Sequence, residues 1–322
     1  MSSKGLKRLV MLAALLLLVG TPVVVAAYLL DQRVEQGPTL AERRLAEVEA
    51  AAREHPDDVG LRLALAATYV ANERPQDAVG QYDAVLKAMP ENVSALLGKA
   101  MILADRGDAA GATPLFERIV SIRKDGEFAT ADTDLQQAYY GLGSVAVVEK
   151  RFDDAVAALE SATRIGGTDA DTWYLLGVAQ LGAGRPLQAV QAEQNAVTFV
   201  PTEWAQPYDT MAKAYAALGK RDHTEYALAM VDLVEKRYPE AKQRLLPLAE
   251  GEAAAQATVG LGLVSEKLGD APGAIEWYRK ALDLDPHNVT ASGGLSRLGV
   301  DLAAPSPAPG VTPTPMPSGG NG

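Results

Sequence analysis

The chain of 322 residues contains no cysteine. Disulfide bonds, cysteine-ligated metal sites and a lipid anchor on an N-terminal cysteine are therefore excluded. Aromatic residues are also scarce, at 6 % of the sequence, which suits helices that pack through alanine and leucine. A chain of this length can bury such a core between neighbouring helices, so it is expected to fold without metals or disulfides.

Residues that carry chemistry are few. The three histidines are His55, His223 and His287, and none has a second ligand nearby at metal-binding spacing, so we expect all three in surface turns. The sequence also lacks a phosphate-binding loop, a G-x-S-x-G elbow and an H-E-x-x-H pair. It therefore predicts no catalytic residue, no cofactor and no metal, and indicates that the protein is not an enzyme.

Positive charge is in deficit. The chain has 30 basic and 41 acidic residues, for a net charge of −11, and no basic stripe is visible along it. This balance argues against a nucleic-acid partner. The acidic surface would instead keep an alanine-rich protein in solution. Neither nucleic acid nor a small-molecule substrate is an expected partner.

What the sequence does contain is a repeat. Pro56 and Pro90 lie 34 residues apart, each after an apolar helix-like run, and this period is typical of a repeating helical hairpin. Two helices cross closely only where a side chain is small, so a small residue that recurs once per helix marks each crossing. Glycines between the helices can adopt the left-handed conformation that ends a helix. The recurring residues are Ala78, Ala112, Ala155, Ala189 and Ala274 in the second helices, Ala66, Ala100, Gly143, Gly177, Ala212 and Gly262 in the first helices, and Gly107, Gly184, Gly219 and Gly269 between them.

These repeats resemble the tetratricopeptide repeat family, in its bacterial membrane-anchored type. The resemblance covers residues 56–300, in about five to six repeats, and implies an all-α solenoid in which stacked helical hairpins form a superhelix. The residues that carry the match include Leu65-Ala66, Tyr69, Ala78, Tyr82 and Pro90; Trp173, Leu176-Gly177, Gly184, Ala189 and Pro201; and Leu261-Gly262, Gly269, Ala274, Tyr278 and Pro286.

The period breaks twice. Ala112 and Ala155 lie 43 residues apart, so we expect an extra loop near residues 123–134. At the second break, around residues 220–254, the alignment of the chain to the repeat is left open. Thr224 takes the small position of one second helix, and residues 239–250 are predicted to add one helix.

The chain begins with a basic segment, residues 1–8, and a 22-residue apolar run, residues 9–30. As a helix this run would span about 33 Å, which matches the apolar core of a bilayer, and the basic residues before it favour a cytoplasmic N-terminus. We therefore expect a single-pass signal anchor in the cell membrane, with the repeats in a periplasm or another extracytoplasmic space. A cleaved signal peptide is the alternative, because Val25-Ala26-Ala27 fits a small-residue cleavage site.

Two further segments flank the repeats. Thr39 to Glu42 forms a capping box that opens a charged helix within the linker, residues 31–55. This helix is expected either to pack on the first repeat through Leu45 and Val48 or to form a stalk. In residues 301–322 proline alternates with small residues, so this tail cannot bury a core and is expected to be disordered, or to be a ligand for another protein's groove.

The resemblance also implies a binding groove, because the ligand-facing positions of the family lie on the first helix of each hairpin. Most of these side chains are apolar here, which favours an apolar or amphipathic protein or peptide segment. The lysine and asparagine set that holds a C-terminal carboxylate in chaperone-binding members is missing. Alternatively, these side chains only pack against one another in a tight superhelix. The predicted groove residues are Leu63, Ala67 and Val70; Leu97, Met101 and Asp105; Tyr140, Ser144 and Val147; Tyr174, Val178 and Leu181; and Asp209 and Lys213.

Together these features predict a membrane-anchored scaffold that binds other proteins through its groove while an envelope complex is assembled. One alternative rests on the stretch from Leu45 to Asp58, followed by Leu65-Ala66 and Tyr69, which is similar to the repeat proteins of c-type cytochrome biogenesis. That similarity implies a factor that holds apocytochrome for haem attachment. A protein secreted after signal cleavage is the other alternative.

Overall fold

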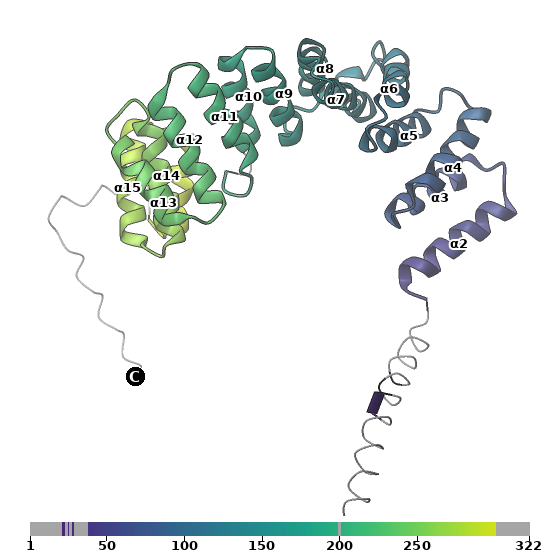
Figure 1. Ribbon diagram of the computed structural model, residues 1–322, viewed down its shortest axis with the longest axis horizontal. Helices are drawn as coiled ribbons and strands as arrows, with labels where there is room; N and C mark the ends of the chain where they lie inside the picture. Colours follow the sequence, from purple (N-terminus) through teal and green to yellow (C-terminus); the bar gives the residue numbers. More distant parts are fainter. Residues whose placement is uncertain (1–20, 23–24, 26–27, 29–37, 199–200, 301–322) are drawn as a thin grey trace, which may run out of the picture. The chain divides into compact units, whose positions relative to one another are not determined.

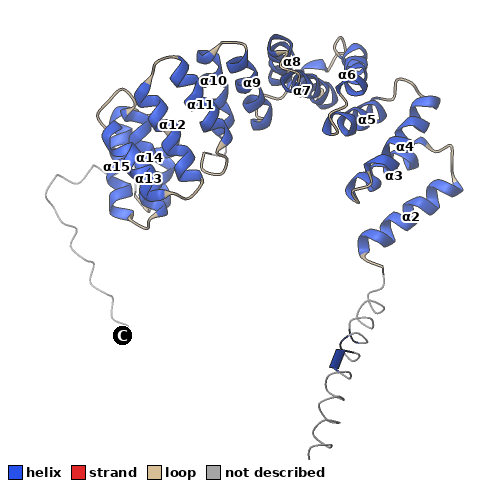
Figure 2. Ribbon diagram, in the orientation of Figure 1, coloured by secondary structure: helices blue, strands red, loops and turns tan. Residues whose placement is uncertain are grey.

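The structure is a computed structural model that describes residues 21–22, 25, 28, 38–198 and 201–300. These residues form α-helices, short 3-10 helices and loops, and no strand occurs among them (Figure 2). The predicted all-α class is therefore confirmed over this part of the chain. The chain divides into two compact units, Met1–Arg118 and Ile119–Gly322, whose helices are labelled and coloured along the sequence in Figure 1.

The predicted terminal segments fall mostly outside the part of the chain that the structure describes. Residues 1–8 and 301–322 lie outside the described residues, and so does most of the predicted anchor, residues 9–30. Within the part that is described, no helix combines the length and the apolar character that crossing a bilayer requires.

In the first unit the helices pack on their neighbours in chain order. Helix α2 packs on α3, α3 on α4, and α4 on α5. The core lies between these helices and includes Leu65, Tyr69, Tyr82 and Val85. The helices are α2 (Leu40–Glu54), α3 (Val59–Ala71), α4 (Pro75–Ala88), α5 (Val93–Asp105) and α6 (Ala109–Arg123), within which the boundary of the unit falls.

Helix α2 belongs to the first unit rather than standing apart as a stalk. The capping box is present at its start, where Thr39 accepts from the backbone of Glu42 and the Glu42 carboxylate accepts from the backbone of Thr39. Leu45 and Val48 pack against the core of the first repeat, as predicted. The Tyr69 hydroxyl also donates to Glu49 of α2 at 2.9 Å.

The second unit continues the pattern of hairpins. Helices α7 and α8, α9 and α10, α11 and α12, and α14 and α15 pair within hairpins, and each hairpin packs on the next helix along the chain. The helices are α7 (Thr133–Val148), α8 (Phe152–Ile165), α9 (Ala170–Gly182), α10 (Pro186–Thr198), α11 (Gln206–Ala217), α12 (Arg221–Val234), α13 (Tyr238–Leu245), α14 (Ala254–Lys267), α15 (Ala271–Leu284) and α16 (Val289–Arg297), with the 3-10 helices η1 (Ala129–Ala131) and η2 (Leu246–Leu248).

Local chemistry sets where these helices begin and end. The side chains of Asp58, Asn92 and Asn288 accept from the backbone N–H three residues further on and cap α3, α5 and α16. The turn after α9 passes through Gly184 at φ +73°, a left-handed conformation that favours glycine. Caps and turns therefore fix the hairpin lengths that the 34-residue period reflects.

In both units, residues of similar size recur at two positions in the second helix of each hairpin, small at one position and larger at the other. The fourth residue is a fully buried alanine in α4, α6, α8, α10 and α15, and Thr224 holds the same place in α12, as predicted. We call the eighth residue the slot residue. Wherever its contacts are described, it packs over a small residue on the first helix of a hairpin. A Cβ added at Gly143 would come within 2.4 Å of Leu159, and one at Gly262 within 2.3 Å of Tyr278. The slot residues are Tyr82, Phe116, Leu159, Glu193, Leu228 and Tyr278.

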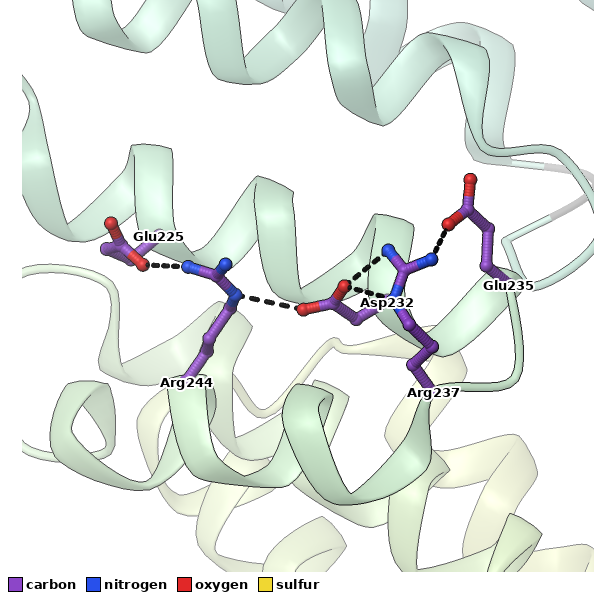
Figure 3. A network of polar contacts seen from close by, with 5 residues as sticks. All are labelled: Glu225, Asp232, Glu235, Arg237 and Arg244. Atoms are coloured by element: carbon purple, nitrogen blue, oxygen red, sulfur yellow. Dashed lines mark hydrogen bonds and ion pairs between the residues drawn. The ribbon is translucent and has the colours of Figure 1, made fainter.

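Both predicted breaks in the period are present. The loop between α6 and α7 carries the short helix η1, and the added helix predicted over residues 239–250 is α13 followed by η2. Helix α13 packs on both α12 and α14, so it separates two hairpins that would otherwise be direct neighbours. Asp232 of α12 lies buried between Arg237 and Arg244 and accepts hydrogen bonds from Nε of each, at 2.8 and 2.9 Å (Figure 3). These ion pairs fasten α13 to α12.

Candidate functional site

In the first unit the predicted groove residues differ in their exposure. Val70 of α3 and Met101 of α5 are 46 % and 47 % exposed, and Ala67 and Asp105 also face solvent. Ala67 lines a cleft of about 730 Å³ between α2 and α3. Leu63 is half-buried against the core, and Leu97 is buried. Leu97 therefore does not present a binding surface.

In the second unit the predicted residues lie on three first helices that contact one another. Helix α9 packs against both α7 and α11. The residues on α7 and α9 are half-buried, whereas those on α11 are exposed. These residues form what we call the first-helix face: Tyr140, Ser144, Val147, Tyr174, Val178, Leu181, Asp209 and Lys213.

The first-helix face includes one member of an aromatic pair, Tyr174, whose partner is Trp204 in the loop before α11. The rings of Tyr174 and Trp204 meet edge to face with their centroids 4.8 Å apart, and both side chains are half-buried. Asp209 and Lys213 form an ion pair one turn apart on α11. Burial, followed by the nearby Glu193 carboxyl, raises the pKa of Tyr174, which stays a neutral hydrogen-bonding group. Such a patch combines apolar area with polar groups at its edge.

Glu193 is the most unusual residue behind this face. It is fully buried, and among the described residues neither of its carboxyl oxygens has a hydrogen-bond partner. It is the slot residue of α10, and a Cβ at Gly177 would come within 2.3 Å of its Oε1. Burial raises the pKa of Glu193 to about 10, so the side chain is a neutral acid at physiological pH.

The sequence did not predict one pocket of this unit. This pocket, which we call the C-terminal pocket, has a volume of about 410 Å³, and helices α10, α11, α12, α14 and α16 supply its walls. None of its lining residues carries a charged side chain. Its apolar wall includes Val197, Tyr208, Met211, Tyr226, Met230 and Leu263.

The histidines do not form a metal site in the part of the chain that is described, where no group of three or more His, Asp or Glu residues could hold a metal ion. His55 and His287 are exposed, as expected for surface turns. His223 departs from that expectation, because it lies in the first turn of α12 and packs half-buried against Tyr215, with the ring centroids 5.0 Å apart.

Three features of the site went beyond the sequence prediction: Trp204, Glu193 and the C-terminal pocket. Trp204 reads as a loop residue, and its contact with Tyr174 depends on how α9 and α11 pack. Glu193 could have been found, because counting eight residues into α10 places it in a slot that aromatic or aliphatic residues fill elsewhere. The pocket has no local signal, since its walls come from helices far apart in the chain.

Comparison with known proteins places these features in a family. A family model for the tetratricopeptide repeat matches residues 63–127, 140–203 and 226–289. A solved structure of a MamA RS-1 double mutant is 20 % identical with a TM-score of 0.50, and the match covers 56 % of this chain and 96 % of that one. At this identity the likeness bears on the fold alone.

Two curated relatives are peroxisomal targeting signal receptors, one from Eremothecium gossypii and one from Saccharomyces cerevisiae, and each is 23 % identical to this chain. The first matches over 229 residues, which are 63 % of this chain and 40 % of the receptor. The second matches over 205 residues, 52 % of this chain and 33 % of the receptor. The chain thus spans less than half the length of these relatives.

The three matched spans cover more than half of the chain and fall on its helical hairpins. The buried alanine at the fourth place of the second helices and the left-handed glycines between helices agree with this assignment. The chain belongs to the tetratricopeptide repeat family.

Proposed function

We propose that this protein is a scaffold that binds an apolar or amphipathic segment of another protein on its first-helix face. The observation that carries this proposal is the half-buried Tyr174–Trp204 pair beside the Asp209–Lys213 ion pair. Aromatic side chains at the centre of a surface, with polar groups around them, are the composition of binding hot spots. The curated relatives are named as receptors for a targeting signal, which supports a peptide segment as the ligand.

The proposal also includes the location of the scaffold in the cell. Residues 9–30 anchor it in the cell membrane, and the repeats work outside the cytoplasm during the assembly of an envelope complex. The apolar run of 22 residues, which contains no charged side chain, and the basic residues before it support this part of the proposal.

The binding part is tested by capturing partners from an envelope extract with the full chain and with matched variants. Tyr174→Arg and the charge reversal Lys213→Glu both change the first-helix face, and the exposed Lys213 can be changed without disturbing the core. We expect both to lose the partners that the parent chain captures. The control is Leu187→Arg, which introduces the same positive charge as Tyr174→Arg at a 57 % exposed leucine of α10. Equal recovery of partners by all three variants would reject the first-helix face as the binding surface.

The location is tested separately by the mass of the mature chain. An anchored protein keeps residues 9–30 and fractionates with membranes after a high-salt wash. A mature chain that starts at Tyr28 would mean signal cleavage and a protein free of the membrane. This outcome would leave the binding test unaffected, so the two parts of the proposal can fail independently.

A further inference from the structure

The C-terminal pocket has the chemistry of a site for an uncharged segment. The chain as a whole carries a net charge of −11, yet every residue that lines this pocket is uncharged. The half-buried side chains of Tyr226, Val197 and Val259 supply apolar surface, and Gln194 supplies an amide. Tyr208, Met211 and Met230 are buried in the wall. Aromatic side chains beside hydrogen-bonding groups are the usual setting in which proline-rich segments are bound.

The rim of the pocket carries an uncovered apolar side chain. Val289, the first residue of α16, lines the pocket and is 82 % exposed, the highest value among the large hydrophobic side chains that are described. Its neighbour Asn288 caps α16, so the rim is held in place. A ligand in the pocket would cover Val289 and remove apolar area from water.

The chain itself offers a segment of matching chemistry. Residues 302–322 contain no charged side chain, and they include Pro313-Thr314-Pro315-Met316-Pro317. This segment follows Val300, which packs on the core of the same unit that holds the pocket. Helix α16 is about 13 Å long and an extended chain covers about 3 Å per residue, so about five residues lead from its end back to its start. Pro313 lies beyond that minimum.

We propose that residues 313–317 bind in the C-terminal pocket of their own chain. Pro315 and Met316 pack against Tyr226 and Val259, and Val289 contacts the segment from the rim. Because the segment is tethered, its effective concentration at the pocket is on the order of millimolar, so a weak site is occupied without any external partner. The segment then acts as a built-in competitor for any other uncharged ligand. This proposal does not depend on the scaffold function.

The absence of cysteine makes a distance measurement on the full chain direct. Spin labels at Lys213→Cys, which is exposed on α11, a helix that contributes to the pocket wall, and at Ser318→Cys, just after the proposed segment, report the distance between tail and pocket. We expect a narrow distance distribution in the parent chain. Val289→Asp and Met316→Asp each place a carboxylate in an uncharged contact, and each should broaden the distribution about twofold, toward that of a free linker.

The matched control is Val148→Asp, which introduces the same charge at a 76 % exposed valine of α7 outside the pocket. It should leave the distribution narrow. A broad distribution in the parent chain, or one that Val289→Asp and Val148→Asp change equally, would overturn the proposal. A narrow distribution that is lost on dilution with unlabelled protein would also overturn it, because a second copy would then fill the pocket.

Discussion

At the scale of single residues, Glu193 is the clearest departure from the repeat pattern. Its pKa is raised by burial from 4.5 to about 10, so between these values the folded chain keeps a proton that the unfolded chain releases. Below pH 4.5 both states are protonated and the residue costs nothing through ionisation. Above it the folded state loses stability as pH rises, by about 1.4 kcal/mol per pH unit. Near pH 7 this cost reaches about 3 kcal/mol.

The first prediction is that Glu193→Leu stabilises the protein at neutral pH. Leucine fills the same slot in α8, where Leu159 lies over Gly143, so the size is compatible. Denaturant unfolding at pH 7 should show a gain of about 3 kcal/mol, and the fall in stability between pH 5 and pH 8 should shrink. Glu160→Leu, at an exposed glutamate of α8, is the control and should leave the pH dependence as it is. An unchanged pH profile for Glu193→Leu would show that the buried acid is not responsible.

The second prediction concerns the small residues that pack against slot residues. Gly262→Ala would place a Cβ 2.3 Å from the ring of Tyr278, which is fully buried and whose hydroxyl donates to Glu266. The ring cannot move aside, so we expect a loss of about 1–3 kcal/mol in unfolding free energy. Gly80→Ala provides the contrast, because nothing lies within 4 Å of its added Cβ on α4. The unfolding free energy of Gly80→Ala should rise by about 0.5–1 kcal/mol because of helix propensity. Equal effects of the two changes would contradict the close packing of Tyr278 over Gly262.

At the scale of elements, helix α13 is the part that a regular repeat does not have. The buried Asp232 carboxylate holds it through Arg237 and Arg244, while Glu225 and Glu235 bind the same two arginines from outside (Figure 3). Both arginines are partly exposed, so solvent screens these ion pairs and their net value is modest. Their main effect is to fix where α13 lies between α12 and α14.

The third prediction follows from this arrangement. Asp232→Ala leaves two partly exposed arginines without their shared acceptor, and we expect a loss of about 1 kcal/mol in the unfolding free energy. Hydrogen exchange should rise first in residues 238–248, because their attachment to α12 is weakened. Glu235→Ala removes only an exposed partner of Arg237 and should change stability by less than about 0.5 kcal/mol. If exchange rose evenly along the second unit, the ion pairs would not be specific to α13.

The sequence was most informative about elements with a local cause. A small residue at the fourth place of a second helix, a capping box at Thr39 and a proline at the start of α13 each act within one or two turns, and the structure has all three. Leu97 shows where such reasoning ends. Its place on α5 matches the ligand-facing pattern, but the structure buries it, and burial depends on side chains from other helices. Trp204 was missed for the same reason, because its partner lies on α9.

At the scale of the whole molecule, the repeat architecture limits how far a local change can act. In a solenoid each hairpin contacts only its neighbours, so stability is close to a sum over repeats and the interfaces between them. Substitutions on the first-helix face and in the C-terminal pocket should therefore alter binding at each site separately, even though α11 contributes to both. Additive effects in a chain that combines Lys213→Glu with Val289→Asp would support this independence.

The buried acid also leaves a signature in the heat of unfolding. At pH 7 the folded chain carries one more proton than the unfolded chain on account of Glu193, so each molecule releases about one proton to the buffer as it unfolds. The apparent calorimetric enthalpy therefore includes the buffer's heat of protonation, and it should be lower in Tris than in phosphate. The Glu193→Leu chain should show a smaller difference between the two buffers. Thermal unfolding of this protein is thus a proton-releasing reaction, and its measured heat depends on the solution that accepts the proton.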